Sequence, residues 1–386
     1  MNPTAGFVLD EDQAALASAA AEASRQILGG TLKEDDEAER FRKEYIRALG
    51  EAGLCGVATP EEYGGLGLGY REYAVVLEEI ARVSASYAVS VAVTGLPQII
   101  LAQAGDDAQK QRWLPGLAAG ELLGGFALSE PGAGSDAGSL RATARREGEE
   151  YILDGTKFWI THGGVADVYI LMARTGGPGA RGISAFILPA DAPGLSFGKK
   201  EEKMGLRASP TVELVLEGCR IPASNRVGPE GAGFQVAMGA LDGGRITIGA
   251  VSVGICQAAL DVAAAYATQR KQFDSAIIDL QGVGFMLADM ACRTEASRLL
   301  VHKAAALKDG GLPYAQSASM AKCVATDSAM AVTQDAVQVL GGYGYTREYP
   351  VERYMRDAKV MQIVEGTNQV QRVVIARHLK RRYEGT

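Results

Sequence analysis

The chain of 386 residues is 47% hydrophobic and carries a formal net charge of -7. This composition predicts a globular protein of two or three domains, or one large domain, and excludes an intrinsically disordered chain. The acidic balance argues against a general binder of nucleic acids or anionic membranes, because both need a dominantly basic surface. An anionic ligand would therefore have to be held by a local cluster of cations.

The spacing of cysteine and histidine indicates neither a disulfide framework nor a metal site built by the protein. The cysteines are odd in number and form no CxxC pair, so we expect reduced, mostly buried thiols at Cys55, Cys219, Cys256, Cys292 and Cys323. The histidines lack an HExxH or HxxxH spacing: His162, His302 and His378. We expect no metal, and we expect redox or group-transfer chemistry to need an organic cofactor.

The segment near the N-terminus carries acidic residues, Asp10, Glu11 and Asp12, before an alanine-rich stretch. This is the wrong charge for a secretory or mitochondrial targeting signal. Asp242, Arg245 and Asp261 interrupt the most apolar region, so we expect no run of membrane-spanning length. The sequence therefore predicts a cytoplasmic protein without a membrane span.

Residues 1–121 have the pattern of a helical domain. Apolar residues recur there at three- and four-residue steps, as at Phe41, Tyr45, Ile46 and Leu49. The glycine cluster at 64–69 is predicted to be a turn between helices, because Tyr70 stands where a GxGxxG dinucleotide motif needs glycine. Gly105 and Asp106 predict a break and an N-cap before a last short helix.

Residues 122–229 have the pattern of an antiparallel β-barrel or sandwich. Apolar runs at 168–172, 183–188 and 212–216 are separated by turns that contain glycine or proline, with no helix between them. Asp154-Gly155 lies between two further runs, 151–153 and 157–161, and is predicted to be the tight turn of a hairpin.

Residues 230–386 return to helical patterning and predict a four-helix bundle. Its long segments, rich in alanine, leucine and valine, are 232–269, 281–308, 313–340 and 367–382. Several are apolar over more than one face, which indicates a second buried face against a partner subunit or a ligand. The whole chain is thus predicted to be α+β and mostly α.

Two local patterns are candidates for chemistry. The loop 126–136 combines glycines with serines and can present N–H groups and hydroxyls to an anion or a polar ring edge, or it is an ordinary turn. No lysine follows its glycines, so it is not a nucleoside-triphosphate loop. Glu365 lies between Ile363-Val364 and Gly366, and it is either a turn acid or a base held away from water.

Read together and in order, several motifs resemble those of the acyl-CoA dehydrogenase family. They are FALSEPGAGSDAG (126–138), DGTKFWITHGG (154–164), LDGGRI (241–246), RKQF (270–273), QVLGGYGYTREYPVERYMRDAK (338–359) and EGTNQVQR (365–372). Because they span all three segments, the resemblance covers nearly the whole chain. It implies a helical N-terminal domain (1–121), a middle β-barrel (122–229) and a C-terminal four-helix bundle (230–386).

The resemblance also implies FAD as the cofactor. It places Phe126, Leu128, Ser129 and Ser135 along the flavin, with Trp159 and Thr161 against its ring, where a flat apolar wall suits an isoalloxazine. Thr367 and Gln369 are implied to contact FAD as well.

Family members share each FAD across a dimer. The resemblance therefore implies that a second group reaches the partner subunit's cofactor: Arg270, Gln272, Phe273, Gln281, Gln338, Gly341 and Gly342. Arg270 would face the FAD diphosphate and supply the cation that the acidic chain otherwise lacks. Asp274 departs from the glycine that many members have, which leaves the geometry of that turn open. A homotetramer, a dimer of dimers, is implied.

Glu365 matches the family's catalytic base. The implied reaction removes the α-proton of an acyl-CoA thioester and a β-hydrogen as hydride, leaving a trans-2-enoyl-CoA. The resemblance implies that the backbone N–H at the base position and a flavin ribityl hydroxyl donate to the thioester oxygen and stabilise the enolate-like charge. Burial beside Ile363 and Val364 is expected to raise the pKa of the Glu365 carboxyl towards neutrality.

Some relatives carry the base at the position of Gly244. Glycine has no side chain and cannot act as a base. This combination resembles straight short- and medium-chain or branched short-chain members, and the motifs LDGGRITIG and EGTNQVQR are most similar to the short-chain and branched short-chain ones. The resemblance implies that Asp242, Arg245, Ser135 and Gly366 contact substrate. Arg245 could also be a charge on a helix surface. The exact acyl chain stays open, because one methylene changes binding by only about 1–3 kcal/mol.

The expected electron acceptor is an electron-transfer flavoprotein. Two alternatives share the fold: a relative that acts on an acyl-carrier-protein thioester, and an oxidase that uses O2. A flavin-free helical interaction module is the alternative outside the enzymes.

Overall fold

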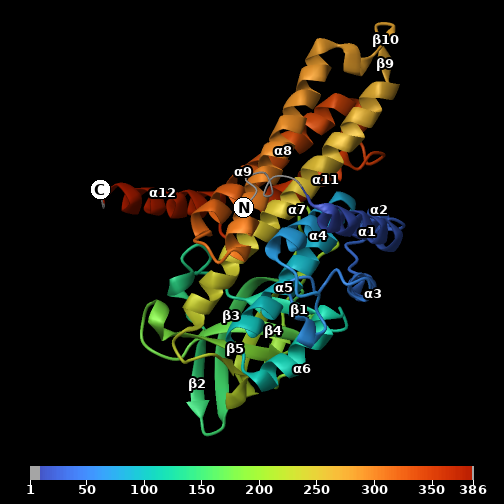
Figure 1. Ribbon diagram of the computed structural model, residues 1–386. Coiled ribbons are helices and arrows are strands. Elements are labelled where there is room, and N and C mark those ends of the chain that lie inside the picture. The colour runs from blue at the N-terminus through green and yellow to red at the C-terminus, as the bar shows by residue number, and fades with distance from the viewer. Residues whose placement is uncertain (1–8, 385–386) are drawn as a thin grey trace.

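Six helices form the first segment of the computed structural model, which describes residues 9–384 (Figure 1). They are α1 (Glu11–Leu28), α2 (Leu32–Glu37), α3 (Lys43–Glu51), α4 (Tyr70–Val83), α5 (Ala85–Ala104) and α6 (Asp107–Ala118). The glycine cluster at 64–69 leads from a 3-10 turn (Glu61–Tyr63) into α4, as predicted. Asp106 caps α6 by accepting a hydrogen bond from the Gln109 N–H at 2.8 Å, which confirms the predicted N-cap.

An eight-stranded sheet forms the middle segment. Its strands are β1 (Gly124–Ala127), β2 (Thr143–Glu147), β3 (Glu150–Thr161), β4 (Val168–Arg174), β5 (Ile183–Pro189), β6 (Leu195–Phe197), β7 (Thr211–Pro222) and β8 (Arg226–Val227). The main path runs β6-β7-β3-β2-β4-β5-β8, with β1 paired to β4. Most pairs are antiparallel, but β1 and β2 each meet β4 in parallel. The sequence predicted a purely antiparallel arrangement, and the sheet is instead mixed. The β2–β3 hairpin lies between β1 and β4 in the chain, so β4 can run in the same direction as β1.

The hairpin predicted at Asp154-Gly155 is wrong. Both residues lie inside the continuous strand β3, and the hairpin turn falls at Gly148, which has φ 59°. The pairing register between β3 and β7 shifts at this point because β7 contains an extra residue. Leu153 pairs with Cys219, and Gly155 pairs with Leu216. The Asp154 carboxylate accepts a hydrogen bond from the Gly218 N–H at 2.7 Å and thereby stabilises this bulge. Asp-Gly suits a bulge as well as a turn, because both need unusual backbone angles.

The C-terminal segment is again helical. Its elements are α7 (Gly233–Gln269), β9 (Lys271–Gln272), β10 (Ser275–Ala276), α8 (Gln281–Asp309), α9 (Ala315–Leu340), α10 (Gly342–Tyr345), α11 (Val351–Met361) and α12 (Asn368–Glu384). The long helices α7, α8 and α9 pack against one another, and α11 packs on α7 and α9. The last helix, α12, packs on α9 and then projects away from the body (Figure 1). The spacing of apolar residues did not indicate α11.

Two helices correct the expectation that no apolar run reaches membrane-spanning length. α5 and α7 are long and apolar enough by composition, but 89% and 78% of their most apolar windows are buried inside the fold. They therefore have the pattern of core helices.

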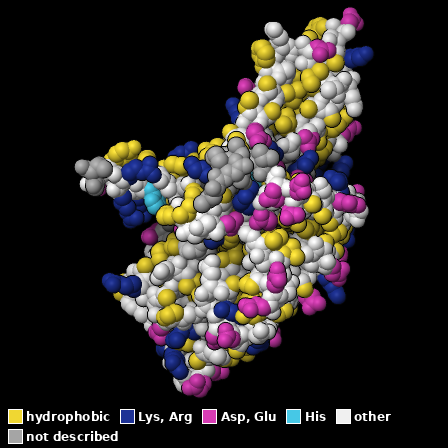
Figure 2. Space-filling model, viewed as in Figure 1, with side chains coloured by type: hydrophobic (Ala, Val, Ile, Leu, Met, Phe, Trp, Pro, Cys, Tyr) yellow, Lys and Arg dark blue, Asp and Glu magenta, His cyan; other side chains and the backbone are white. Residues whose placement is uncertain are grey.

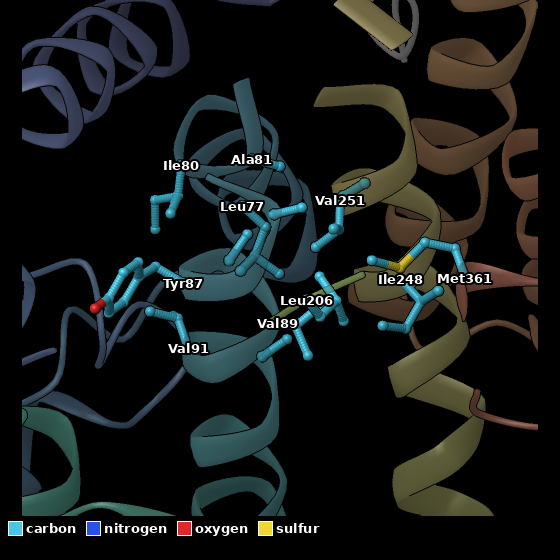
Figure 3. Packing of buried hydrophobic residues seen from close by; sticks show 14 of the residues in the cluster. Leu77, Ile80, Ala81, Tyr87, Val89, Val91, Leu206, Ile248, Val251 and Met361 are labelled. Atoms are coloured by element: carbon cyan, nitrogen blue, oxygen red, sulfur yellow. The ribbon is translucent and has the colours of Figure 1, made fainter. Parts of the chain in front are cut away.

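The hydrophobic core is continuous where α4, α5 and α7 meet. Figure 3 shows Leu77 of α4, Val89 of α5 and Val251 of α7 pointing toward one another. Leu206, from the segment before β7, and Met361, at the end of α11, join the same cluster. All three segments thus contribute to one core. Met361, a member of this core, precedes Glu365 by four residues in the chain.

A buried ion pair joins the loop after β1 to β3. The Lys157 side chain is 0% exposed, and its Nζ donates to the Glu130 carboxylate at 2.7 Å and to the Leu128 carbonyl at 3.1 Å. Glu130 also accepts hydrogen bonds from the N–H groups of Arg141 and Ala142. This pair fixes the loop 128–142 to β3.

We expect Lys157→Met to lower the free energy of unfolding by about 3–5 kcal/mol, because it leaves the Glu130 carboxylate buried without a cation. Denaturant unfolding followed by circular dichroism checks the loss. The matched double variant Lys157→Met/Glu130→Gln removes both charges and should regain part of it. A loss below about 1 kcal/mol in the single variant would contradict this role.

Candidate functional site

Glu365 lies on the turn between α11 and α12, against α7. Its backbone is left-handed, with φ 55°, which is uncommon for a residue with a side chain. The Oε2 atom is buried and finds no hydrogen-bond partner among the described residues. A Cβ added to Gly244 would lie 2.6 Å from Oε2, so a larger residue at 244 would collide with the carboxylate.

Burial raises the pKa of the Glu365 carboxyl to about 7. The nearby cations Arg245 and Lys322 lower it, but they do not offset the loss of solvation. A carboxyl with a pKa near 7 is half ionised at neutral pH, which suits a group that accepts a proton during a reaction.

Further unpartnered polar atoms surround the same part of α7. Within the described chain, Tyr70 Oη and Arg245 Nε are buried without a hydrogen-bond partner, like Glu365 Oε2. A Cβ on Gly243 would lie 2.5 Å from Tyr70 Oη. Buried polar groups are nearly always hydrogen-bonded, so atoms of this kind gathered at one place indicate a ligand with polar groups of its own.

Arg245 is not a charge on the helix surface. The residue is 6% exposed, and its guanidinium pairs with Asp242 one turn earlier and donates to Ser319 Oγ at 3.4 Å. Burial raises the pKa of the Asp242 carboxyl, while Arg245 lowers it. The two predicted substrate residues therefore form one partly buried unit beside Glu365.

Hydrogen bonds hold the turn that carries Glu365. Gln371 Nε2 donates to the carbonyls of Glu365 and Gly366, at 3.1 and 2.8 Å, and Lys322 Nζ donates to the Gly366 carbonyl at 3.0 Å. The Glu365 N–H has no acceptor among the described residues. Thr367 and Gln369, two predicted cofactor contacts, line a pocket of 430 Å³ beside this turn.

The other predicted cofactor residues of the middle segment lie on β1, on the loop that follows β1 and on the last residues of β3. The Ser129 carbonyl accepts a hydrogen bond from the Phe158 N–H at 2.9 Å, so the loop after β1 lies beside Trp159. Ser135 is exposed farther along this loop, and Thr161 is half-buried where β3 ends.

Trp159 is both exposed and conformationally unusual. The register between β3 and β7 shifts a second time between Lys157 and Ile160, where β3 contains the extra residue. Trp159 lies in this bulge with φ 61°. Its side chain is 60% exposed and contacts the Phe158 ring edge-on at 4.9 Å. A left-handed conformation at a bulky residue is strained, and here it presents a flat aromatic ring to solvent. Such a ring fits a planar aromatic cofactor.

Helix α7 connects the two parts of the site. Leu128 and the partly buried Phe126 pack in one cluster with Ala237, Ala240 and Leu241 of α7. Gly243 and Gly244, farther along the same helix, face Tyr70 and Glu365. A ligand that extends from Trp159 to Glu365 would therefore run along one helix.

The remaining predicted cofactor residues lie elsewhere, around the end of the long helices that points away from the sheet (Figure 1). Tyr266 of α7 and Tyr343 of α10 are in ring contact at 6.3 Å, which brings this group to one end of the molecule. All of its members are exposed: Arg270, Gln272, Phe273, Gln281, Gln338, Gly341 and Gly342. Apolar side chains are exposed there too (Figure 2), including Phe273 at 88% and Phe285 at 65%.

The turn with the unexpected Asp274 is a two-residue hairpin between β9 and β10. Phe273 and Asp274 have φ angles of 51° and 61°. Positive angles at both turn residues are the geometry in which glycine or asparagine is favoured, and aspartate is tolerated. The hairpin is therefore compatible with Asp274 at the position where many family members have glycine.

The sequence did not single out Tyr70 or Lys322 as site residues. A lone lysine in the apolar segment 313–340 is a signal, because lysine is rarely fully buried without a reason. Tyr70 gave no such signal: its approach to Gly243 depends on how α4 packs on α7.

Comparison with known proteins assigns all three segments. Models of acyl-CoA dehydrogenase N-terminal, middle and C-terminal domains match residues 10–121, 125–219 and 231–380. The short-chain specific acyl-CoA dehydrogenase of Clostridium acetobutylicum is 46% identical over 345 residues, which cover 89% of this chain and 91% of that protein.

Solved structures are similar over almost the whole chain. Butyryl-CoA dehydrogenase from Megasphaera elsdenii superposes with a TM-score of 0.94 at 43% identity, covering 97% of this chain and 99% of that one. A chain in a structure of the electron transferring flavoprotein of Acidaminococcus fermentans has a TM-score of 0.95 at 46% identity, with the same coverage. PigA with FAD and proline has a TM-score of 0.94 at 29% identity, also with the same coverage.

The raised pKa of Glu365 predicts how Glu365→Gln changes stability with pH. A carboxyl with a folded-state pKa near 7 stabilises the fold fully below its unfolded value of about 4.5, and this contribution is lost as pH rises through 7. Glutamine does not titrate, so the variant should gain about 3 kcal/mol on the wild type between pH 4.5 and 8.

Denaturant unfolding at both pH values measures this gain. The matched control Glu149→Gln removes a carboxylate whose side chain is 93% exposed, and its stability difference should stay small at both. A difference for Glu365→Gln that does not change with pH would show that Glu365 is solvated.

Proposed function

This chain belongs to the acyl-CoA dehydrogenase family, and from that premise we propose that Glu365 is the base that removes the α-proton of a short-chain acyl-CoA. The observation that carries the proposal is the unpartnered Glu365 Oε2 beside Gly244, in a carboxyl whose pKa is raised by burial. A side chain at 244 would exclude this placement, so this chain has room for the base at 365.

FAD is the cofactor. The exposed ring of Trp159 suits its isoalloxazine. Phe126, Leu128, Ser129 and Ser135, on β1 or the loop after it, and Thr161, at the end of β3, would contact the cofactor as well. Thr367 and Gln369, which line the pocket beside the base turn, would contact the same cofactor. When bound, FAD accepts the β-hydrogen of the substrate as hydride at the flavin N5 position.

Proton removal needs more than one carboxylate, because the α-proton of a thioester is very weakly acidic. The Glu365 carboxylate takes the proton, and the developing negative charge moves to the thioester oxygen. The N–H of Glu365, which has no acceptor among the described residues, is positioned to donate to that oxygen. Gly366 gives the turn the backbone freedom that this approach needs, with φ 84°.

The Asp242–Arg245 pair would hold the CoA part of the substrate. Arg245 Nε is buried and unpartnered within the described chain, so it retains a donor for a polar group of the ligand. A short acyl chain is proposed because the similar proteins include one described as short-chain specific and one as butyryl-CoA dehydrogenase.

A dimer, within a tetramer, would complete the cofactor site. The exposed group around Arg270 lies at the end of the long helices that points away from the sheet (Figure 1), whereas Trp159 lies on β3 of that sheet. We therefore propose that this group contacts the FAD of a partner. The exposed Phe273 and Phe285 would then be covered. We also propose that the chain divides into three domains, with boundaries at 121/122 and 229/230. The proposed electron acceptor is an electron-transfer flavoprotein.

An anaerobic panel of acyl-CoA thioesters tests this function. Butyryl-CoA is expected to bleach the flavin absorbance of the wild-type protein, while Glu365→Gln should keep FAD and lose bleaching by about 10³-fold or more. Bleaching by an acyl carrier protein thioester and by no acyl-CoA would overturn the substrate. Undiminished bleaching in Glu365→Gln would overturn the base.

The close approach at Gly244 gives a second test with a matched control on the same helix. We expect Gly244→Ala to displace the Glu365 carboxylate and lower kcat/KM at least 10-fold, because its Cβ would lie 2.6 Å from Oε2. Gly239→Ala, where nothing lies within 4 Å of an added Cβ, should retain wild-type turnover. Equal activity of the two variants would contradict the proposed position of the base.

A further inference from the structure

We propose that Lys322 is a positioning residue for the base: it holds the turn that carries Glu365 and places a positive charge near the carboxylate. This inference rests on the proposed function of Glu365. Lys322 lies on α9 and is 0% exposed. Its Nζ donates to the Gly366 carbonyl at 3.0 Å and to Asn368 Oδ1 at 2.9 Å, so both acceptors are neutral oxygens.

A buried ammonium group bonded to neutral oxygens is expensive for a fold. Removing such an ion from water costs several kcal/mol, and an apolar side chain of similar volume would pack in the same space without that penalty. Lys157, the other fully buried lysine of the described chain, has Glu130 as a carboxylate partner. Lys322 has no hydrogen bond of that kind, so packing alone does not explain its charge.

The charged groups around Lys322 explain why a charged residue is present at this buried position. Burial lowers the pKa of the Lys322 ammonium group to about 8, and Arg245 lowers it further. Glu365 opposes this most strongly, ahead of Cys323 and Asp327, and so favours the charged form. Asp327 already pairs with Arg372 at 2.9 Å and accepts hydrogen bonds from Gln362 and Asn368. Of the carboxylates that act on Lys322 within residues 9–384, Glu365 is therefore the one that has no other cation in an ion pair.

Glu365 is faced by groups from three helices. Arg245 of α7 and Lys322 of α9 favour its ionised form, and the Tyr70 hydroxyl of α4 lies near enough to be affected by it. The Arg245 guanidinium shares its charge with Asp242. Lys322 is the cation beside the base whose hydrogen bonds reach no carboxylate among the described residues.

The hydrogen bonds of Lys322 also fix the direction of the base. Gly366 follows Glu365 directly, and its carbonyl accepts from Lys322 and from Gln371. Asn368 begins α12 and returns a hydrogen bond to Thr326, one turn after Lys322 on α9. Because Glu365 has a strained left-handed φ, these bonds to its neighbours help to keep that conformation.

Two substitutions separate the charge from the hydrogen bond. Lys322→Gln removes the charge and retains a donor for the Gly366 carbonyl, whereas Lys322→Met removes both. In the flavin-loaded enzyme, both variants should shift the acidic limb of the kcat/KM profile upwards by about 0.5–1 pH unit, because an ionised Glu365 loses a nearby cation. Lys322→Met should also lower kcat about 10-fold.

The matched control is Thr333→Val on the same helix, which removes a buried hydroxyl that donates to the Ala329 carbonyl at 2.7 Å. It should change stability and leave the acidic limb in place. A second readout needs no turnover: the pH dependence of the stability difference between each protein and its Glu365→Gln derivative should move upwards by the same amount in the Lys322→Gln background.

The outcomes distinguish this inference from the proposed function. A wild-type enzyme that no acyl-CoA reduces would overturn the function itself. Normal wild-type reduction with an unmoved acidic limb in folded Lys322→Gln would overturn only the role of Lys322. Failure of Lys322→Gln to fold would also contradict the inference, because it would show that the fold, rather than the base, requires the lysine.

Discussion

The close approach of the Glu365 carboxylate to the backbone of α7 is the contact on which the rest of the site depends. It requires glycine at 244, a left-handed residue at 365 and a turn held by buried donors from α9 and α12. Each of these features is unfavourable in isolation. Together they place a carboxylate in a poorly solvated position, where burial raises its pKa to about 7.

The long helix α7 serves as the common frame. Its first turns pack on the loop beside Trp159, its Gly244 faces the base, and Arg270 follows at its far end in the exposed group. The buried Lys157–Glu130 pair and the three-segment core hold the sheet and the helices around it. Rigid elements on all sides allow the positions of the base and the cofactor ring to be fixed together.

Much of this arrangement could be predicted from the sequence, and the failures have physical causes. Helical periodicity and the order of motifs predicted the three segments, and the flanks of Glu365 predicted a desolvated carboxyl. Asp154-Gly155 misled because the same two residues suit a tight turn and a bulge, and pairing with β7 decides between them. Tyr70 and Lys322 come near Glu365 only through the packing of α4 and α9 on α7, which local sequence does not specify.

The central claim is that Glu365 takes a proton from the carbon next to the thioester, and exchange of that proton measures it directly. An acyl-CoA is incubated anaerobically in D2O with wild-type enzyme or Glu365→Gln, and deuterium at the α-carbon is followed by mass spectrometry. The account predicts exchange with the wild type and none above background with Glu365→Gln. Exchange at the wild-type rate in Glu365→Gln would contradict it.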